Sequence, residues 1–236
     1  MPDNEQGNVE VSIIIPCRNE KDYIAGVLDS IVTNDFPKEK LEVIVADGMS
    51  DDGTRSVIEE YEKLYSFIRL VDNLRKIVPC ALNEAIRNAK GRIIMRMDAH
   101  AVYPSNYISR LVSALQELKA DNDGAAWQTL PGGKGLVPKA IALTLSHPFG
   151  VGNATYRLSN GGKTTPIETD TVPFGCYGRE VFFRIGLFDE ELVRNQDNEL
   201  NERLKKTGVR IFLIPDVIIQ YFARKTFSKL WKMFFQ

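Results

Sequence analysis

The sequence predicts an α/β fold in which a mostly parallel central sheet is flanked by helices. Short runs of β-branched and apolar residues, typical of buried parallel strands, alternate with segments whose apolar residues recur at helical spacing. Strands that alternate with helices form βαβ units with right-handed crossovers. The chain has 236 residues, 44% hydrophobic and 26% charged, which suits a soluble domain with a sizeable core.

The first hundred residues contain the clearest alternation. Strands are expected in four short runs, at residues 11–15, 41–46, 67–71 and 92–97. Helices are expected between them, at residues 24–31, 57–64 and 81–89. Pro16 should end the first strand, Asp52 or Thr54 should cap the second helix, and Gly91 should be the C-cap of the third. This half has the pattern of a nucleotide-binding fold.

The rest of the chain is less regular. Further helices are expected at residues 107–118, 138–145, 180–185 and 199–206. Strands are expected at residues 171–176 and 209–214. Residues 121–135 and 159–166 are rich in Gly, Asn, Asp, Thr and Pro, so we expect loops there. Residues 1–8 should form a disordered tail.

Composition excludes several classes of protein. The formal net charge of −1 disfavours a nucleic-acid binder. Three widely spaced cysteines, Cys17, Cys80 and Cys176, fit a reducing compartment better than a disulfide framework. The polar N-terminus has no features of a secretory signal, and no run of about 20 apolar residues occurs that would span a membrane.

Polar residues follow two of the predicted strands. Asp98 and His100 come where the run at 92–97 ends, and Asp47 follows the run at 41–46. In an extended chain residues i and i+2 point to the same side, and ligands of open α/β sheets bind at the carboxyl ends of the strands. Asp98 and His100 therefore form a candidate metal site. The alternative is a turn carboxylate beside an exposed imidazole.

Two phosphate-binding motifs are missing from the sequence. No G-x-G-x-x-G follows the first strand, and no G-x-x-x-x-G-K-[ST] occurs anywhere. Dinucleotide cofactors and P-loop hydrolysis are therefore disfavoured. A nucleotide bound without a glycine loop needs its phosphates neutralised in another way, which a divalent cation provides.

Four motifs in a fixed order carry a resemblance to a known family. They are Val11-Ser-Ile-Ile-Ile-Pro-Cys-Arg-Asn-Glu20, Val45-Ala-Asp-Gly-Met-Ser-Asp-Asp-Gly-Thr54, Ala81-Leu-Asn-Glu-Ala-Ile-Arg-Asn-Ala-Lys-Gly91 and Met97-Asp-Ala-His100. From about residue 9 onward the chain resembles the inverting family-two glycosyltransferases of GT-A fold, with a Rossmann-like sheet. Met-Asp-Ala-His and the Gly-Leu-Phe-Asp-Glu of residues 186–190 are most similar to membrane-associated, succinoglycan-type enzymes of exopolysaccharide synthesis.

The resemblance implies a division of the chain and a nucleotide site. Residues 9–221 would form the GT-A catalytic domain, with a nucleotide-binding half at 9–100 and an acceptor half at 101–221. The first nucleotide-contacting loop of the family matches Pro16, Arg18 and Glu20. Asp47 matches the carboxylate that accepts a hydrogen bond from uracil. Lys76 or Arg75 falls near a basic residue that touches the base or the phosphate.

The resemblance also implies a metal site that departs from the family pattern. Asp98 matches the first Asp of the family's D-x-D motif, which meets the ribose and the metal bound to the diphosphate. His100 stands where the family usually has the second Asp, the direct metal ligand. The cofactor implied is a divalent cation, Mn²⁺ or Mg²⁺.

The catalytic base is implied at Asp197. The family has Glu-Asp at this point, and here Gln196 replaces the Glu. One carboxylate must take the proton of the acceptor hydroxyl as that oxygen attacks C1 of the sugar. The alternative role for Asp197 is a helix N-cap, which Asp often fills.

Other polar residues have simpler interpretations. Asp51 and Asp52 suit a turn and a cap, and Glu190 and Glu191 suit a solvated surface. His147 precedes a proline in a loop, which favours a structural role over acceptor binding. Cys176 has no histidine near it in sequence, so a nucleophilic thiol is disfavoured.

The function implied is transfer of a sugar, with inversion, from a UDP-sugar to a saccharide or lipid-linked saccharide acceptor in extracellular polysaccharide synthesis. An alternative is a nucleotide-sugar-binding protein that has lost transferase activity, because His100 and Gln196 replace family carboxylates. A sugar-phosphate nucleotidyltransferase is disfavoured, since no Gly-rich basic loop follows the first strand.

Residues 222–236 predict a basic amphipathic helix. Its apolar face carries Phe227, Leu230, Trp231, Phe234 and Phe235, and its other face carries Lys225, Lys229 and Lys232. Such a helix suits a membrane surface, and packing against the domain is the alternative. The resemblance implies membrane-spanning helices beyond this point. It also implies a location in the cytoplasm, on the cytoplasmic face of the inner membrane.

Overall fold

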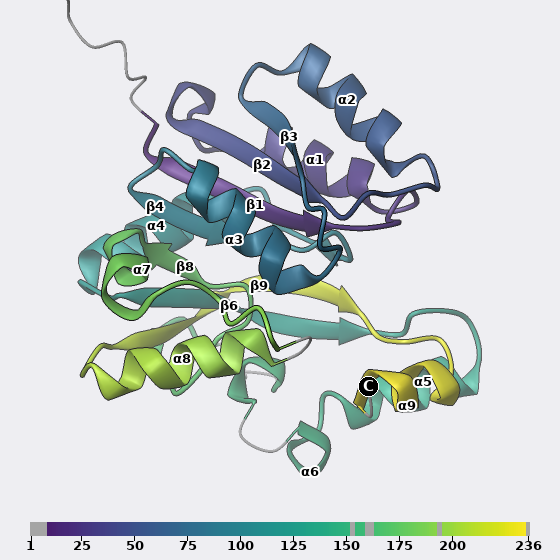
Figure 1. Cartoon of the computed structure of the whole chain (residues 1–236). Helices are drawn as coiled ribbons and strands as arrows, with labels where there is room; N and C mark the ends of the chain where they lie inside the picture. Colours follow the sequence, from purple (N-terminus) through teal and green to yellow (C-terminus); the bar gives the residue numbers. More distant parts are fainter. Residues whose placement is uncertain (1–8, 152–153, 159–162, 193–194, 235–236) are drawn as a thin grey trace, which may run out of the picture.

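The computed structural model describes residues 9–151, 154–158, 163–192 and 195–234, so the expected tail at 1–8 lies outside the described residues. Within these ranges nine strands form one curled sheet with helices on both faces (Figure 1). The predicted α/β class is confirmed. The N-terminal half of the sheet is parallel and the C-terminal half is mixed.

The N-terminal half follows the predicted alternation. Its four strands are parallel and lie in the order β3-β2-β1-β4, with bounds β1 (Val11–Cys17), β2 (Leu41–Asp47), β3 (Ile68–Asp72) and β4 (Ile93–Arg96). The connecting segments contain α1 (Ile24–Val32), the short 3₁₀ helix η1 (Lys38–Lys40), α2 (Thr54–Leu64) and α3 (Val78–Asn88). These carboxyl strand ends share one edge of the sheet, where the site is expected.

Three local predictions in this half were wrong in detail. β1 continues through Pro16, which pairs in register with Ala46 of β2. The N-cap position of α2 is Gly53, although the Asp52 carboxylate does accept a hydrogen bond from the Thr54 amide at 2.9 Å. Gly91 is not the C-cap of α3, which is Ala89, and a Cβ at Gly91 would lie 2.6 Å from the Ser12 backbone nitrogen. Its role is close approach to β1.

The C-terminal half adds five strands and six helices among the described residues. The strands are β5 (Ala101–Val102), β6 (Asn122–Leu130), β7 (Ile167–Glu168), β8 (Cys176–Gly178) and β9 (Ile211–Phe222). The helices are α4 (Tyr107–Glu117), α5 (Leu136–Thr144), α6 (Pro148–Val151), α7 (Glu180–Ile185), α8 (Gln196–Lys206) and α9 (Phe227–Phe234), with a 3₁₀ turn η2 (Thr155–Arg157). Beyond β4 the strand order is β8-β6-β9-β5, and β7 pairs with β9.

The prediction of a loop over residues 121–135 was wrong for residues 122–130, which form β6 in the middle of the sheet, whereas residues 131–135 do form a loop. Its polar start, Asn122 and Asp123, pairs with β8 on one side and β9 on the other and is fully buried. The Asn122 side-chain amide donates there to the side-chain oxygen of Asn201 in α8, at 2.9 Å. Tertiary pairing therefore overrides the local preference of Asn, Asp and Gly for turns.

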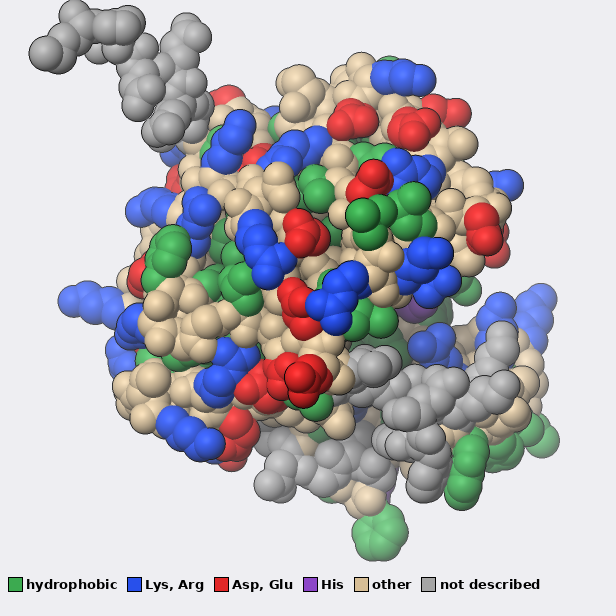
Figure 2. All heavy atoms as spheres, in the orientation of Figure 1, with side chains coloured by type: hydrophobic (Ala, Val, Ile, Leu, Met, Phe, Trp, Pro, Cys, Tyr) green, Lys and Arg blue, Asp and Glu red, His purple; other side chains and the backbone are tan. Residues whose placement is uncertain are grey.

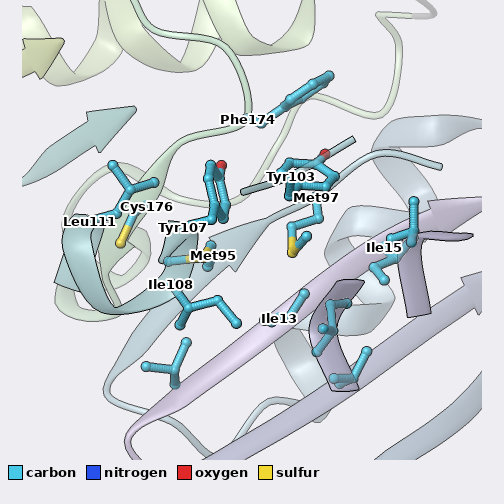
Figure 3. Packing of buried hydrophobic residues seen from close by; sticks show 14 of the residues in the cluster. Ile13, Ile15, Met95, Met97, Tyr103, Tyr107, Ile108, Leu111, Phe174 and Cys176 are labelled. Carbon is cyan, nitrogen blue, oxygen red and sulfur yellow. The ribbon is translucent and has the colours of Figure 1, made fainter. Parts of the chain in front are cut away.

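Two apolar layers enclose the sheet. Alternate residues of β1, such as Ile13 and Ile15, face α1 and α4, whereas Ile14 faces the layer formed with α3, α7 and α8. Figure 3 shows the first layer, in which Met95, Met97, Tyr103, Tyr107 and Phe174 lie close to one another. This packed floor supports the end of β4, where Asp98 and His100 follow.

One fully buried carboxyl in this core lacks a partner. Asp123 pairs in register with Cys176, and neither of its oxygens has a hydrogen-bond partner among the described residues. Burial raises the pKa of Asp123 well above its ordinary value, and Cys176 and Arg110 oppose this rise only in part. Burial therefore favours the neutral form of Asp123 in the folded protein, relative to the unfolded chain, in which an Asp has a pKa of about 3.9.

We expect Asp123→Asn to stabilise the protein at neutral and alkaline pH. A folded-state pKa above the unfolded value gives stability that is complete below about pH 3.9 and is lost, at up to about 1.4 kcal/mol per pH unit, as pH rises toward the folded pKa. The amide does not titrate, so urea unfolding of the variant should show little of this loss. The exposed Asp170→Asn is the control. Parallel pH profiles for Asp123→Asn and the wild type would contradict the assignment.

Candidate active site

A polar pocket lies at the carboxyl ends of β1 and β4, where the parallel sheet predicts a ligand. It is lined by six of the residues expected from the sequence, Pro16, Arg18, Glu20, Lys76, Asp98 and His100. Asn73, Ile77 and Val78 close it from the segment between β3 and α3. The structure thus brings together residues from three separate stretches of the N-terminal half.

Two loops, which follow β1 and β3, line one side of the pocket. The Asn19 backbone takes the left-handed conformation (φ 55°), and its amide donates to the Ser50 hydroxyl at 2.8 Å. Lys76 also has a positive φ of 63°, and the Arg18 guanidinium donates to its carbonyl oxygen at 3.5 Å. The two candidate basic residues differ in position. Lys76 lines the pocket, and Arg75 pairs with Glu190 outside it, at 2.5 Å.

Asp98 and His100 belong to a tight turn after β4. The His100 amide donates to the Asp98 carboxylate at 3.1 Å, and both side chains line the pocket. The buried Tyr103 hydroxyl holds this turn from below, since it accepts a hydrogen bond from the Asp98 amide at 2.6 Å and donates to the Asp98 carbonyl at 3.2 Å. These hydrogen bonds fix the backbone of the turn, and with it the positions of the Asp98 carboxylate and the His100 imidazole.

The His100 ring is paired with Glu20. Nε2 lies 3.0 Å from a Glu20 carboxyl oxygen, and the Tyr23 ring packs edge-on with centroids 4.9 Å apart. Burial, with Asp98 nearby, raises the pKa of Glu20 to about 7, and burial lowers the pKa of His100. Burial therefore favours the neutral imidazole, the form that binds metals.

Asp98 and His100 are a pair of side chains whose chemistry fits a divalent cation. Nδ1 of His100 is buried without a hydrogen-bond partner among the described residues, and the Asp98 carboxylate lines the same pocket. Among those residues no group of three or more carboxylate, imidazole or thiol side chains is arranged to bind a metal. Two protein ligands leave the remaining positions of an ion to water and to phosphate oxygens.

Asp197 lies beside this pocket and not in its lining. It occupies the first turn of α8, whose N-cap position is Asn195, so the N-cap alternative is wrong. Its carboxylate accepts a hydrogen bond from the buried Arg96 guanidinium at 2.5 Å, and Arg96 also lies 3.9 Å from Asp98. Burial raises the pKa of Asp197, and Arg96 opposes that rise. Arg96 thus links the expected base to the expected metal ligand.

Asp47 is the expected nucleotide-binding residue that does not line the pocket. It is fully buried, and its oxygens accept hydrogen bonds from the Ser50 hydroxyl, from the Ser50 amide at 2.9 Å and from Arg55 at 3.1 Å. A nucleobase bound at Asp47 would have to share these carboxylate oxygens or replace one of their hydrogen-bond donors.

The structure also adds residues that sequence reasoning missed. Arg96, Tyr103 and Arg224 lie at the site, and only Arg224 carries a visible signal, a basic pair just after a long apolar strand. The prediction that Glu190 is solvated was wrong. Its carboxylate accepts hydrogen bonds from Asn83 at 2.9 Å and from Arg75. This contact ties residues 186–190 to α3 and to the loop that carries Lys76.

The chain is similar to known proteins in sequence. A family model described as Glycosyl transferase family 2 matches residues 12–186, most of the chain. A dolichyl N-acetyl-glucosaminyl phosphate diacetamido-dideoxy-glucuronosyltransferase of Methanococcus voltae is 29% identical over 94% of this chain and 70% of its own. The succinoglycan biosynthesis protein ExoA of Rhizobium meliloti is 29% identical over all of this chain and 69% of its own.

Solved structures show the same fold. The mannosyltransferase PcManGT of Pyrobaculum calidifontis, in complex with GDP-Man and Mn²⁺, superimposes with a TM-score of 0.72 and 23% identity. The match covers 95% of this chain and 60% of the length of PcManGT. Staphylococcus aureus TarS with UDP-GlcNAc gives 0.68 and 18% identity, over 92% of this chain and 59% of its own. The expected GT-A fold is confirmed, and the motif-based resemblance with it: the chain belongs to glycosyl transferase family 2.

Proposed function

We propose that this protein transfers a sugar, with inversion, from a UDP-sugar to a saccharide or lipid-linked saccharide acceptor in the synthesis of an extracellular polysaccharide. The observation that carries the proposal is the convergence of Arg18, Lys76, Asp98 and His100 on one pocket at the strand ends. Two cations suit a diphosphate, and the acidic-imidazole pair suits a cation that neutralises it. One relative is a glucuronosyltransferase named for a dolichyl N-acetyl-glucosaminyl phosphate, and another is a succinoglycan biosynthesis protein, which supports a lipid-linked saccharide acceptor and polysaccharide synthesis.

Each side chain has a role in this proposal. Pro16, Arg18, Glu20 and Lys76 bind the nucleotide, and Asp47 reaches the base if Ser50 yields one of its oxygens. Asp98 and His100 would hold a Mn²⁺ or Mg²⁺ ion, which supplies positive charge to the departing diphosphate. Asp197 takes the proton from the acceptor hydroxyl, and a single displacement without an enzyme nucleophile inverts C1.

Nucleotide binding tests the proposal directly. A ligand that binds only the folded state raises the unfolding temperature. We expect UDP with Mn²⁺ to raise it, and ADP, CDP and GDP with Mn²⁺ to raise it less. No shift with any nucleoside diphosphate would contradict the proposal, and a larger shift with GDP would move it to another donor base.

The rival function is a nucleotide-sugar-binding protein without transferase activity. His100 and Gln196 in place of family carboxylates favour it. Hydrolysis or transfer of a bound UDP-sugar that requires a divalent cation would exclude this rival.

We expect His100 to set the metal preference. Imidazole is a softer ligand than carboxylate, and it binds Mn²⁺ better than Mg²⁺. The wild type should therefore bind Mn²⁺ in preference to Mg²⁺, and His100→Asp should narrow that difference. The check is titration of each ion in the presence of UDP, with Glu168→Asp, in the distant strand β7, as control. Equal preference ratios in His100→Asp and the wild type would exclude His100 as a ligand.

We also propose attachment to the cytoplasmic face of a membrane through the unit of residues 131–151 and 223–234, the α5–α9 unit. It contains six Lys and Arg residues and no Asp or Glu. Leu230 packs against α5, whereas Phe227 and Trp231 are 59% and 64% exposed. Figure 2 shows hydrophobic and basic side chains together at this end of the molecule. No helix of the described residues is long and apolar enough to cross a bilayer.

We expect Phe227→Glu with Trp231→Glu to abolish most binding to vesicles that contain anionic lipid. Exposed aromatics insert at the interface, and the basic residues supply a salt-dependent attraction. Leu64→Glu, at a 72% exposed position on α2, is the matched control and should bind as the wild type does. Unchanged co-sedimentation of the double variant would contradict this attachment.

A further inference from the structure

Arg224 reaches the donor pocket from the C-terminal end of the described chain. It lines the pocket together with Glu20, Asp98 and His100, although it is 124 positions after His100 in the sequence. The sheet explains this meeting, because Tyr221 of β9 pairs in register with Ala101 of β5, the residue after His100. A cation from the opposite half of the molecule therefore faces the turn that carries the expected metal ligands.

The three cations of this pocket are available to a ligand. Arg18, Lys76 and Arg224 line it, and none of them forms an ion pair with another described residue. Arg18 and Lys76 belong to the loops that follow β1 and β3. Arg224 instead follows β9, whose pairing with β5 brings it to the turn that carries Asp98 and His100. Arg224 is therefore placed at the end of the pocket where a diphosphate would meet Asp98.

The position of Arg224 depends on a close backbone contact in the α5–α9 unit. Ala223 is buried with Ile141, Ala142 and Leu145, and its amide donates to the Leu130 carbonyl at 2.9 Å. A Cβ at Gly132 would lie 1.8 Å from the Ala223 carbonyl oxygen, a separation that no side chain can occupy. Gly132 thus lets the segment before Arg224 lie against the turn that follows β6.

The geometry points to Arg224 as a ligand of the donor's diphosphate, delivered by the α5–α9 unit. This inference rests on the proposed function and names a further residue of its site. A guanidinium donates two parallel hydrogen bonds to phosphate oxygens and stays charged, so it stabilises a bound diphosphate and the same group as it leaves. Membrane attachment of the α5–α9 unit would then hold Arg224 in the donor pocket.

Binding of UDP, UMP and uridine to the whole chain, by calorimetry with Mn²⁺ present, tests the inference. Arg224→Gln should weaken UDP binding about tenfold or more, as expected for a lost charge-assisted contact, should weaken UMP binding less, and should leave uridine binding unchanged. Lys225→Gln removes the same charge one residue away and should bind UDP like the wild type. A change shared by both variants would overturn the inference in favour of general electrostatics.

A second pair of variants tests the delivery of Arg224 without touching the pocket. Gly132→Ala should displace Ala223 and weaken UDP binding as Arg224→Gln does. The double variant Gly132→Ala with Arg224→Gln should bind UDP no more weakly than Arg224→Gln alone. At Gly133 an added Cβ meets nothing closer than 3.7 Å, so Gly133→Ala is the control. If the wild type binds no nucleoside diphosphate, the proposed function and this inference both fail. If it binds UDP and Arg224→Gln binds equally well, this inference alone is overturned.

Discussion

Asp197→Asn is expected to lower the rate of sugar transfer by about 10²- to 10⁴-fold, the range for a lost general base, and to leave UDP affinity nearly unchanged. Asn keeps the size of the side chain and an oxygen for Arg96, but it cannot take a proton. The wild-type rate should fall at acid pH, with a midpoint above that of an exposed Asp, because burial raises the pKa of Asp197. The rate is high above that pKa, where the carboxylate is ionised.

The control for this variant is another carboxylate of the same helix. Glu199 pairs with Arg203 at 2.5 Å on α8, away from the donor pocket. Glu199→Gln should leave turnover near that of the wild type, because the Glu199 carboxylate does not accept the proton of the acceptor hydroxyl. Turnover of Asp197→Asn close to the wild type would refute the base. If Asp197→Asn lowers the unfolding temperature so far that unfolding accounts for the lost turnover, Asp197 would be a structural ion-pair partner of Arg96 instead.

Arg96→Met is expected to destabilise the fold by about 3–5 kcal/mol, the usual cost of removing one partner from a buried ion pair. Arg96 is 4% exposed, donates to Asp197 at 2.5 Å and lies over the Phe174 ring at 5.3 Å. Met fills a similar volume but leaves the Asp197 carboxylate without its cation. Urea unfolding at pH 7 measures the free energy.

The double variant Arg96→Met with Asp197→Leu separates charge from packing. Removing both charges leaves no unpaired carboxylate, so we expect it to be more stable than Arg96→Met alone. The single variant should also shift the acid limb of the transfer rate to higher pH, because Arg96 lowers the pKa of Asp197. If the double variant loses as much free energy of unfolding as the single variants Arg96→Met and Asp197→Leu lose together, the two side chains are not coupled.

Membership of the family and the position of most donor-side residues were predictable from sequence. The four parallel strands are continuous apolar runs, and the loops that follow them carry Arg18, Glu20, Asp98 and His100 at the same sheet edge. Each strand is recognisable from its own apolar run, and the carboxyl ends of parallel strands lie at one edge of the sheet, so the meeting of these loops follows once the strands pair. The short helix at residues 180–185 was also predicted at its observed bounds, as α7.

Other features were decided only by tertiary structure. β6 has a sequence typical of a loop, and it is a strand because β8 and β9 satisfy its backbone on both sides. The engagement of Asp47 by Arg55 removes it from the pocket lining, although its motif is local. The pairing of Arg96 with Asp197 joins residues 101 positions apart, and Arg224 reaches the pocket through the pairing of β5 with β9. Sequence periodicity specifies which side of a strand is buried, but a side chain's partner depends on which distant element packs there, and that is settled only when the whole sheet assembles.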